Sequence, residues 1–221
     1  MSYFIFNNVH SDDMKVIVEN LPPVIRAPQR YNRTEIEGRD GAIIEQIGYK
    51  DYEKEIKIAF KSEDDIWNTM NWLIGKGRLI LSNEQNKYYD AHILDQIDYE
   101  RALRFRKATV SFLVQPYKYS LDEEETNSRI IINQGNVMCN PLITIYGSGK
   151  VDLLVNGVKS CSVTINEYIT LDGERQEAYK GNILQNRLMI GEFPLFAPGE
   201  NVLSFIGNVT NVTTLVRSRW I

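Results

Sequence analysis

The sequence predicts a mainly β protein of two domains, and three observations carry this prediction. Runs of alternating apolar and polar residues recur along the chain, which is the pattern of strands buried on one face. One segment near residues 63–74 instead has apolar residues at helical spacing. A short acidic stretch, residues 121–128, has little apolar content and separates the two halves. At 221 residues the chain is long enough for two domain cores.

The first half predicts a sheet or partial barrel with one helix laid on it. Residues 54–60 place Ile56, Ile58 and Phe60 on one face of a strand. Long alternating strands need a neighbour on each edge, so they indicate a sheet. Further strand candidates with the same alternation are residues 79–81, 91–97 and 103–114.

The predicted helix runs from about Glu63 to Ile74. Ser62 can cap its start, and Asp65 lies at the spacing of a capping box. Gly75 and Gly77 follow where a left-handed cap is expected to end the helix. The side chains expected to pack against the sheet are Ile66, Met70, Leu73 and Ile74, with Trp67 and Trp72 packing at the core or its edge.

The acidic run Asp122–Glu125 marks the predicted domain boundary. It could be a site for a metal or a basic partner. A solvated linker is the preferred interpretation, because adjacent carboxylates repel and no ligand spacing is present. The predicted domains are residues 1–120 and 129–221, joined by the acidic linker 121–128.

The second half predicts a β-sandwich or jelly roll, because short strands and turns follow one another with no helical periodicity. Asn156 and Gly157 are expected to form a two-residue hairpin turn, since both positions need positive φ. Residues 147–150 are expected to form a tight turn, and Pro198 and Gly199 another. The strand candidates are residues 130–132, 142–146, 151–155, 158–165 and 201–206.

The sequence offers no catalytic residue, metal site or cofactor-binding motif, so we expect the protein not to be an enzyme. Its two histidines, His10 and His92, and its two cysteines, Cys139 and Cys161, lack ligand spacing. The cysteines are expected to be buried and unbridged. The glycine-rich residues 147–150 do not follow the phosphate-loop pattern. A net charge of −4 disfavours a dedicated nucleic-acid binder, and no apolar run is long enough to span a membrane.

Several segments in order resemble the distal tail (Dit) proteins of phages with long, non-contractile tails. In the first half these are the Ser-x-Asp-Met turn at Ser11–Met14, a proline-rich crossing at Leu21–Pro28 and the turn Gly38-Arg39-Asp40-Gly41. In the second half they are NPLITIYGSGKVDLLVNG, DGERQEAYKGN, GEFPLFAPGENVLSFIG and the final RSRWI. The resemblance therefore covers nearly the whole chain.

The resemblance implies an N-terminal split β-barrel with one α-helix and a C-terminal galectin-like β-sandwich. It implies a virion structural protein, a baseplate hub at the tail tip of a phage or prophage, made in the bacterial cytoplasm. Six copies would form a homohexameric ring that joins the tail tube protein to a tail-associated tip protein, with receptor-binding or baseplate proteins as further partners. DNA would pass the channel without specific binding, and six copies of a chain with charge −4 give a formal −24.

A host cell-wall carbohydrate-binding module, acting through the second domain, is the alternative function. The second domain has no histidine and a single tryptophan, Trp220, for stacking against a sugar. We expect Trp220 instead to pack as an anchor, so the structural role is preferred.

Overall fold

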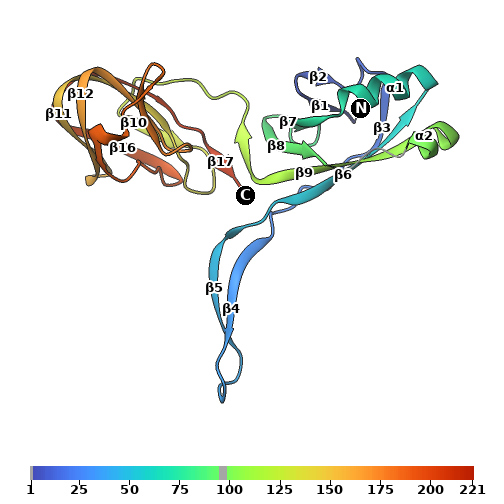
Figure 1. Cartoon of the computed structure of the whole chain (residues 1–221), viewed down its shortest axis with the longest axis horizontal. Helices are drawn as coiled ribbons and strands as arrows, with labels where there is room; N and C mark the ends of the chain where they lie inside the picture. Colours follow the sequence, from blue (N-terminus) through green and yellow to red (C-terminus); the bar gives the residue numbers. More distant parts are fainter. Residues whose placement is uncertain (1, 95–98) are drawn as a thin grey trace. The chain divides into compact units, whose positions relative to one another are not determined.

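The computed structural model describes residues 2–94 and 99–221 and shows a mainly β chain, as the sequence predicts (Figure 1). The chain divides into two compact units. Unit 1 comprises Met1–Lys118 together with Ile221, and unit 2 comprises Tyr119–Trp220. Each unit has a hydrophobic core of its own.

The main sheet of unit 1 has the strand order β2–β1–β7–β8–β9–β6–β3. Strand β6 shows why the sheet forms: its side chains alternate between buried and solvent-facing along its whole length. The strand bounds are β1 Phe4–Phe6, β2 Val9–His10, β3 Val16–Asn20, β6 Tyr52–Phe60, β7 Gly75–Leu81, β8 Lys87–Ile93 and β9 Lys107–Ser120.

Helix α1, Glu63–Trp72, starts at the predicted capping box, in which Ser62 and Asp65 bond each other's backbone N–H. It ends earlier than predicted. Leu73 is the C-cap and is buried, whereas Ile74 lies beyond the cap and is 63% exposed, so its expected packing role is wrong. The chain turns at Gly75, with φ of 74°, straight into β7.

A second helix, α2 (Tyr99–Phe105), replaces the start of the strand predicted over residues 103–114. Its seven residues are too few to show helical periodicity, and the alternation of Leu103 and Phe105 resembles a strand. The strand begins only at Lys107, after Arg106 with a positive φ of 54°. Of the strand predicted over residues 91–97, β8 includes the part up to Ile93, and residues 95–97 lie outside the described residues.

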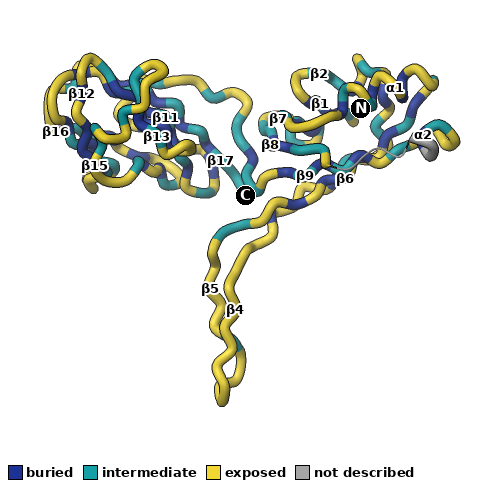
Figure 2. The backbone as a smooth tube through the Cα atoms, viewed as in Figure 1, coloured by how far each residue is buried: buried dark blue, intermediate teal, exposed yellow. Residues whose placement is uncertain are grey.

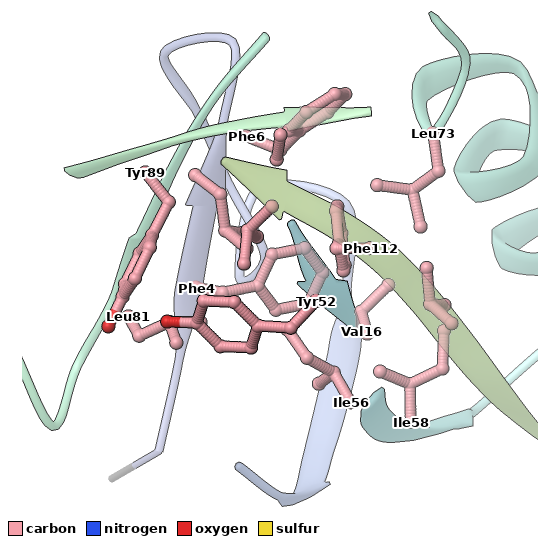
Figure 3. Close-up of a cluster of buried hydrophobic side chains, with 14 of the residues drawn as sticks. Phe4, Phe6, Val16, Tyr52, Ile56, Ile58, Leu73, Leu81, Tyr89 and Phe112 are labelled. Carbon is pink, nitrogen blue, oxygen red and sulfur yellow. The ribbon is translucent and has the colours of Figure 1, made fainter. Parts of the chain in front are cut away.

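Aromatic side chains form the centre of the unit 1 core (Figure 3). The rings of Phe4 and Phe6 meet Phe112 edge to face, with centroids 5.9 and 5.5 Å apart. Trp72 of α1 stacks on Phe4 at 5.3 Å and donates its Nε1 hydrogen to the Phe6 carbonyl. The helix is therefore fastened to β1 by packing and by a hydrogen bond.

Two further strands of unit 1, β4 (Gln29–Glu35) and β5 (Ala42–Tyr49), form a separate two-stranded sheet. They pair with each other in antiparallel fashion and extend as a long hairpin away from the main sheet of unit 1 (Figure 1). We call residues 29–49 the arm.

The sheet of unit 2 has the strand order β10–β16–β11–β12–β13–β14, and β15 pairs with β12. Strands β11, β12 and β16 have 14, 15 and 17 residues, so each is long enough to serve both layers of a sandwich. The bounds are β10 Ile130–Asn133, β11 Leu142–Val155, β12 Val158–Asp172, β13 Glu177–Lys180, β14 Ile183–Leu184, η1 Asn186–Leu188, β15 Met189–Gly191, β16 Gly199–Leu215 and β17 Arg219–Trp220.

Residues 147–150 do not form the predicted tight turn, because β11 runs through them without a break. The pairing of β11 with β16 shifts register on both sides of Gly147 and Ser148. A Cβ on Gly147 would lie 2.1 Å from the Asn208 carbonyl oxygen, so the glycine allows the two strands to approach closely. These glycines therefore mark an irregularity within a long strand rather than its end.

Candidate functional site

The arm is the most exposed ordered element among the described residues of unit 1 (Figure 2). Every residue of β4 is solvent-exposed, and β5 is exposed over Ile43–Ile47. Because β4 and β5 bond only to each other in the described sheets, no main-chain pairing joins the arm to a core. An isolated two-stranded hairpin is marginally stable in water, so such an element is suited to a partner that covers it.

The arm carries apolar side chains on both of its faces. Ile43 and Ile44 are consecutive in β5 and therefore point to opposite faces of the arm. Their cross-strand partners in β4 are Thr34 and Arg33, respectively. Ile44 is 67% exposed. The other large apolar side chains exposed along the arm are Tyr31, Ile36, Ile43 and Ile47. A surface of this kind is typical of a protein–protein contact.

The arm's tip is the turn Gly38-Arg39-Asp40-Gly41 that the sequence singled out. Gly38 and Gly41 have φ of 81° and 83°, and no atom lies within 4 Å of where a Cβ would be. The glycines are needed for the backbone conformation and not for space. Arg39 and Asp40 are exposed at the very end of the arm, where they are free to meet a partner.

The root of the arm is tied by polar contacts where the chain enters and leaves it. The Lys50 N–H donates to the Pro28 carbonyl at 2.8 Å, which closes the two strands at their base. Arg26 donates to the Tyr49 hydroxyl at 3.1 Å, and its guanidinium lies 5.7 Å from the centre of that ring. The exposed hairpin therefore has a defined base.

A buried polar cluster lies next to this root and consists of Tyr52, Lys54, Glu84, Tyr89 and Lys118. Lys118 and Glu84 form an ion pair of 2.6 Å whose side chains are only 7% and 8% exposed. The Tyr89 hydroxyl donates to the other carboxylate oxygen of Glu84. Burial raises the pKa of both tyrosines and lowers the pKa of Lys54, with the nearby Glu84 charge opposing the shift at Lys54.

The remaining turn residues organise unit 2. Asn156 and Gly157, with φ of 53° and 78°, connect β11 to β12. The Asn156 side chain also accepts from the Val202 N–H at 2.8 Å. Gly199, with φ of 89°, follows Pro198 and begins β16. These residues therefore shape the second sheet and bring no reactive groups together.

The acidic run is fastened to unit 2 instead of forming a free linker. A Glu123 carboxylate oxygen accepts from the Ser218 N–H, and Thr126 pairs with Thr214 through two backbone hydrogen bonds. Asp122, Glu124 and Glu125 are exposed. The segment thus lies along the end of β16 and the residues that follow it.

The histidines and cysteines sit apart from one another. His92 lines an open hollow of about 770 Å³ beside β7 and β8, together with Lys76, Arg78 and Asp90. His10 lies in β2, and its ring centre is 4.4 Å from that of Tyr3. Cys139 and Cys161 are buried, unbridged thiols. Their pKa values are raised by burial to about 12 and about 11, which makes them poor nucleophiles at neutral pH.

Within the described part of the chain, no group of three or more His, Cys, Asp or Glu side chains is placed to hold a metal ion. No helix among the described residues combines the length and apolar character needed to cross a membrane. The candidate functional site is therefore the exposed arm together with the polar contacts at its root.

No protein-family model and no curated protein matches the chain. Among solved structures, it is similar to the SPP1 Dit protein (gp 19.1), a paradigm of the hub adsorption apparatus in phages that infect Gram-positive bacteria. The superposition has a TM-score of 0.73 at 17% sequence identity and covers 97% of this chain and 98% of that one. The chain has the Dit fold.

The chain is also similar, with lower TM-scores, to two chains of the phage p2 baseplate in its activated conformation. The structure with strontium has a TM-score of 0.55 at 11% identity and covers 97% of each chain. The structure with calcium has a TM-score of 0.54 at 11% identity and covers 96% of each chain. The similarity therefore includes both units of this chain.

Sequence reasoning placed the turn at the arm's tip but missed the length of the arm and the buried cluster. A signal for Lys54 was present: it shares the even-numbered face of β6 with Ile56 and Ile58, which the alternation assigns to the core. A lysine on a core face indicates a buried polar contact. For the arm, the isoleucines of β5 suggested no separate hairpin, because they do not alternate with polar residues and their exposure depends on what packs nearby.

Proposed function

We propose that this protein is the distal tail protein, the tail-tip hub, of a long-tailed phage or prophage. The observation that carries the proposal is the match to SPP1 Dit over almost the full length of both chains. A shared fold alone does not determine a function. Here the similarity includes both units, and the similar structures are a phage hub protein and chains of a phage baseplate.

In this role six copies form a closed ring. A ring is built from a heterologous interface, in which one surface of each copy meets a different surface of the next. The arm supports this arrangement, because its exposed isoleucines and its unpaired strand edges can be covered by a neighbouring copy. The neighbour thereby stabilises a hairpin that would be marginal alone.

The ring joins the tail tube protein to the tail-associated tip protein and offers its outer side to receptor-binding or baseplate proteins. The chain is made in the bacterial cytoplasm and ends at the virion tail tip. DNA passes through the ring without specific binding, since the net charge of −4 per copy does not favour retention of phosphate groups. This role requires assembly and no catalysis.

Sedimentation velocity of the purified chain and of the variant Ile44→Ser tests the proposal. Ile44 is 67% exposed, so its replacement leaves the folded subunit intact but removes apolar contact area from the arm. We expect the wild type to sediment as a hexamer and Ile44→Ser to shift toward smaller species. The matched control is Ile190→Ser in unit 2, a 75% exposed isoleucine outside the arm, which should sediment like the wild type. Identical monomeric sedimentation of all three proteins, with tube and tip proteins present, would count against the proposed function.

A further inference from the structure

The direction of the arm must be set at its root, because its strands have no other support. Residues 21–28 lead into the arm and contain three prolines, Pro22, Pro23 and Pro28. A proline has no N–H to donate, so the backbone at these three positions offers the surrounding structure only its carbonyl acceptors. What donates to those carbonyls decides where the segment lies.

All three proline carbonyls accept a hydrogen bond, each from a different part of unit 1. The Asn83 side chain, in the turn between β7 and β8, donates to the Pro22 carbonyl at 3.0 Å. The Lys54 ammonium of β6 donates to the Pro23 carbonyl at 3.2 Å. The Lys50 N–H donates to the Pro28 carbonyl at 2.8 Å. The lead-in segment is thus held along its length.

Lys54 is the unusual donor of the three. Its side chain is 1% exposed, and its Nζ lies 4.8 Å from the centre of the Tyr89 ring and 5.6 Å from that of Tyr52. A buried ammonium loses its hydration, which is costly unless the group gains specific contacts. The carboxylate of the cluster, Glu84, is already paired with Lys118 and accepts from Tyr89. Lys54 is therefore not needed to neutralise Glu84, and its direct polar contact is to the lead-in segment.

Lys54 also belongs to the strand that leaves the arm. Strand β5 ends at Tyr49 and β6 begins at Tyr52, so Lys54 lies a few residues after the arm. Its hydrogen bond is to Pro23, which lies a few residues before the arm. A single side chain thus ties the incoming segment to the outgoing strand on the buried side of the root. Its ammonium lies against the rings of Tyr52 and Tyr89. Both rings belong to the buried cluster of unit 1 (Figure 3).

We propose that Lys54 is a positioning residue for assembly, which fixes the direction in which the arm leaves unit 1 through its hydrogen bond to the Pro23 carbonyl. This role rests on the proposed function, because the direction of the arm matters only where a neighbouring copy receives it. A hydrogen bond from a charged donor is strong enough that its loss raises the population of other arm directions about tenfold or more.

Lys54→Met tests the role, since methionine keeps the apolar stem and removes the ammonium. Glu84 keeps Lys118 and Tyr89 as partners, so unit 1 should unfold at an unchanged midpoint. Lys118→Met is the matched contrast within the same cluster. It leaves the buried Glu84 carboxylate with the Tyr89 hydroxyl but without its ion-pair partner, and we expect it to lower the unfolding midpoint without affecting the arm. Lys57→Met, at an exposed position of the same strand, should change neither property.

Pulsed electron–electron double resonance measures the distance between two spin labels, and labels on the arm and on α1 therefore report the arm's direction. Nitroxides are attached to Asp40→Cys at the tip and Asn68→Cys on α1, both exposed positions, while the native thiols are buried and label poorly. Labelled chains are diluted into unlabelled protein so that only distances within one chain are seen. We expect a narrow distance distribution in the wild type, the Lys57→Met variant and the Lys118→Met variant, and a clearly broader one in Lys54→Met.

Ring formation by the same variants is followed by sedimentation. A broadened distribution in Lys54→Met together with weakened assembly supports the proposal, and an unchanged distribution overturns it. If Lys54→Met does not fold, Lys54→Leu, which also keeps an apolar side chain and removes the ammonium, decides by the same criterion. A wild type that forms no ring would defeat the proposed function, while the distance distributions would still decide whether Lys54 orients the arm.

Discussion

Replacing Arg217 by methionine should destabilise unit 2 strongly. Both terminal nitrogens of Arg217 donate to Asp172, at 2.6 and 3.2 Å, and the Asp172 side chain is 3% exposed. Burial by itself raises the pKa of Asp172. The hydrogen bonds from Arg217 and from the N–H groups of Arg175 and Glu174 outweigh burial, so the pKa is lowered overall.

The magnitude follows from what the variant leaves behind. Removing one partner of a buried ion pair costs about 3–5 kcal/mol. Asp172 keeps its two backbone N–H donors, so we expect the lower end of the range, about 3 kcal/mol. For a domain of about 100 residues this corresponds to a fall in melting temperature of roughly 12 °C or more. Arg175→Met is the matched control: its side chain is 71% exposed and lies 3.8 Å from the same carboxylate, so it should cost no more than about 1 kcal/mol.

Thiol labelling in urea reads out unit 2 alone, because the chain's two cysteines both lie there and are buried. With a typical urea dependence, about 3 kcal/mol moves the labelling midpoint by about 1 M or more. Since the folded-state pKa of Asp172 is below 3.8, the pair stabilises unit 2 fully above that pH, and this stabilisation is lost as the pH falls through the lowered pKa. The difference between the wild type and Arg217→Met should therefore shrink in acid. Equal midpoints at pH 7 would refute the reasoning.

Three further substitutions test the packing and the turns. Leu73→Ala removes a buried side chain at the end of α1 and should lower the free energy of unfolding by about 2–5 kcal/mol, seen as faster hydrogen exchange in α1. Ile74→Ala, at the exposed neighbouring position, should have little effect. Equal exchange in both variants would contradict the packing. Gly41→Val places a β-branched side chain at φ 83° and should lower the stability of the turn by about 1–3 kcal/mol. The arm's amides should then exchange hydrogen faster, while those of unit 2 are unchanged. Unaltered exchange in the arm would rule out the strained turn. Asn201→Ala removes a fully buried amide that accepts from the Ala197 N–H and donates to the carbonyls of Ala197 and Gly199. It should lower the thiol-labelling midpoint by the equivalent of at least about 1–3 kcal/mol, and an unshifted midpoint would be the contrary result.

Local patterns predicted the elements whose signals are contained in a few neighbouring residues. The capping box at Ser62 and Asp65 located the start of α1, because the hydrogen bonds that define it join residues three apart. The alternation in β6 identified a half-buried strand for a similar reason. The end of α1 was predicted two residues too late, since Ile74 continues the apolar pattern although the backbone has already left the helix.

Features that depend on distant parts of the chain could not be read in this way. Residues 147–150 resemble a turn locally, yet they lie within a strand. Asn208 of β16, which is 61 residues later in the sequence, lies next to Gly147 and pairs with this part of β11. The same holds for Arg217 and Asp172, which are 45 residues apart. The exposure of Ile43 and Ile44 is likewise a property of the fold. These two consecutive isoleucines show no alternation, and their sequence did not predict a strand that stands apart from a core.

The assembly state of the purified chain tests the hub role most directly. Negative-stain images combined with a native mass measurement should show a six-fold ring of about 153 kDa, six times the 25.5 kDa of one chain. A particle of 25.5 kDa at high concentration, unchanged when tail tube and tip proteins are added, would contradict the account.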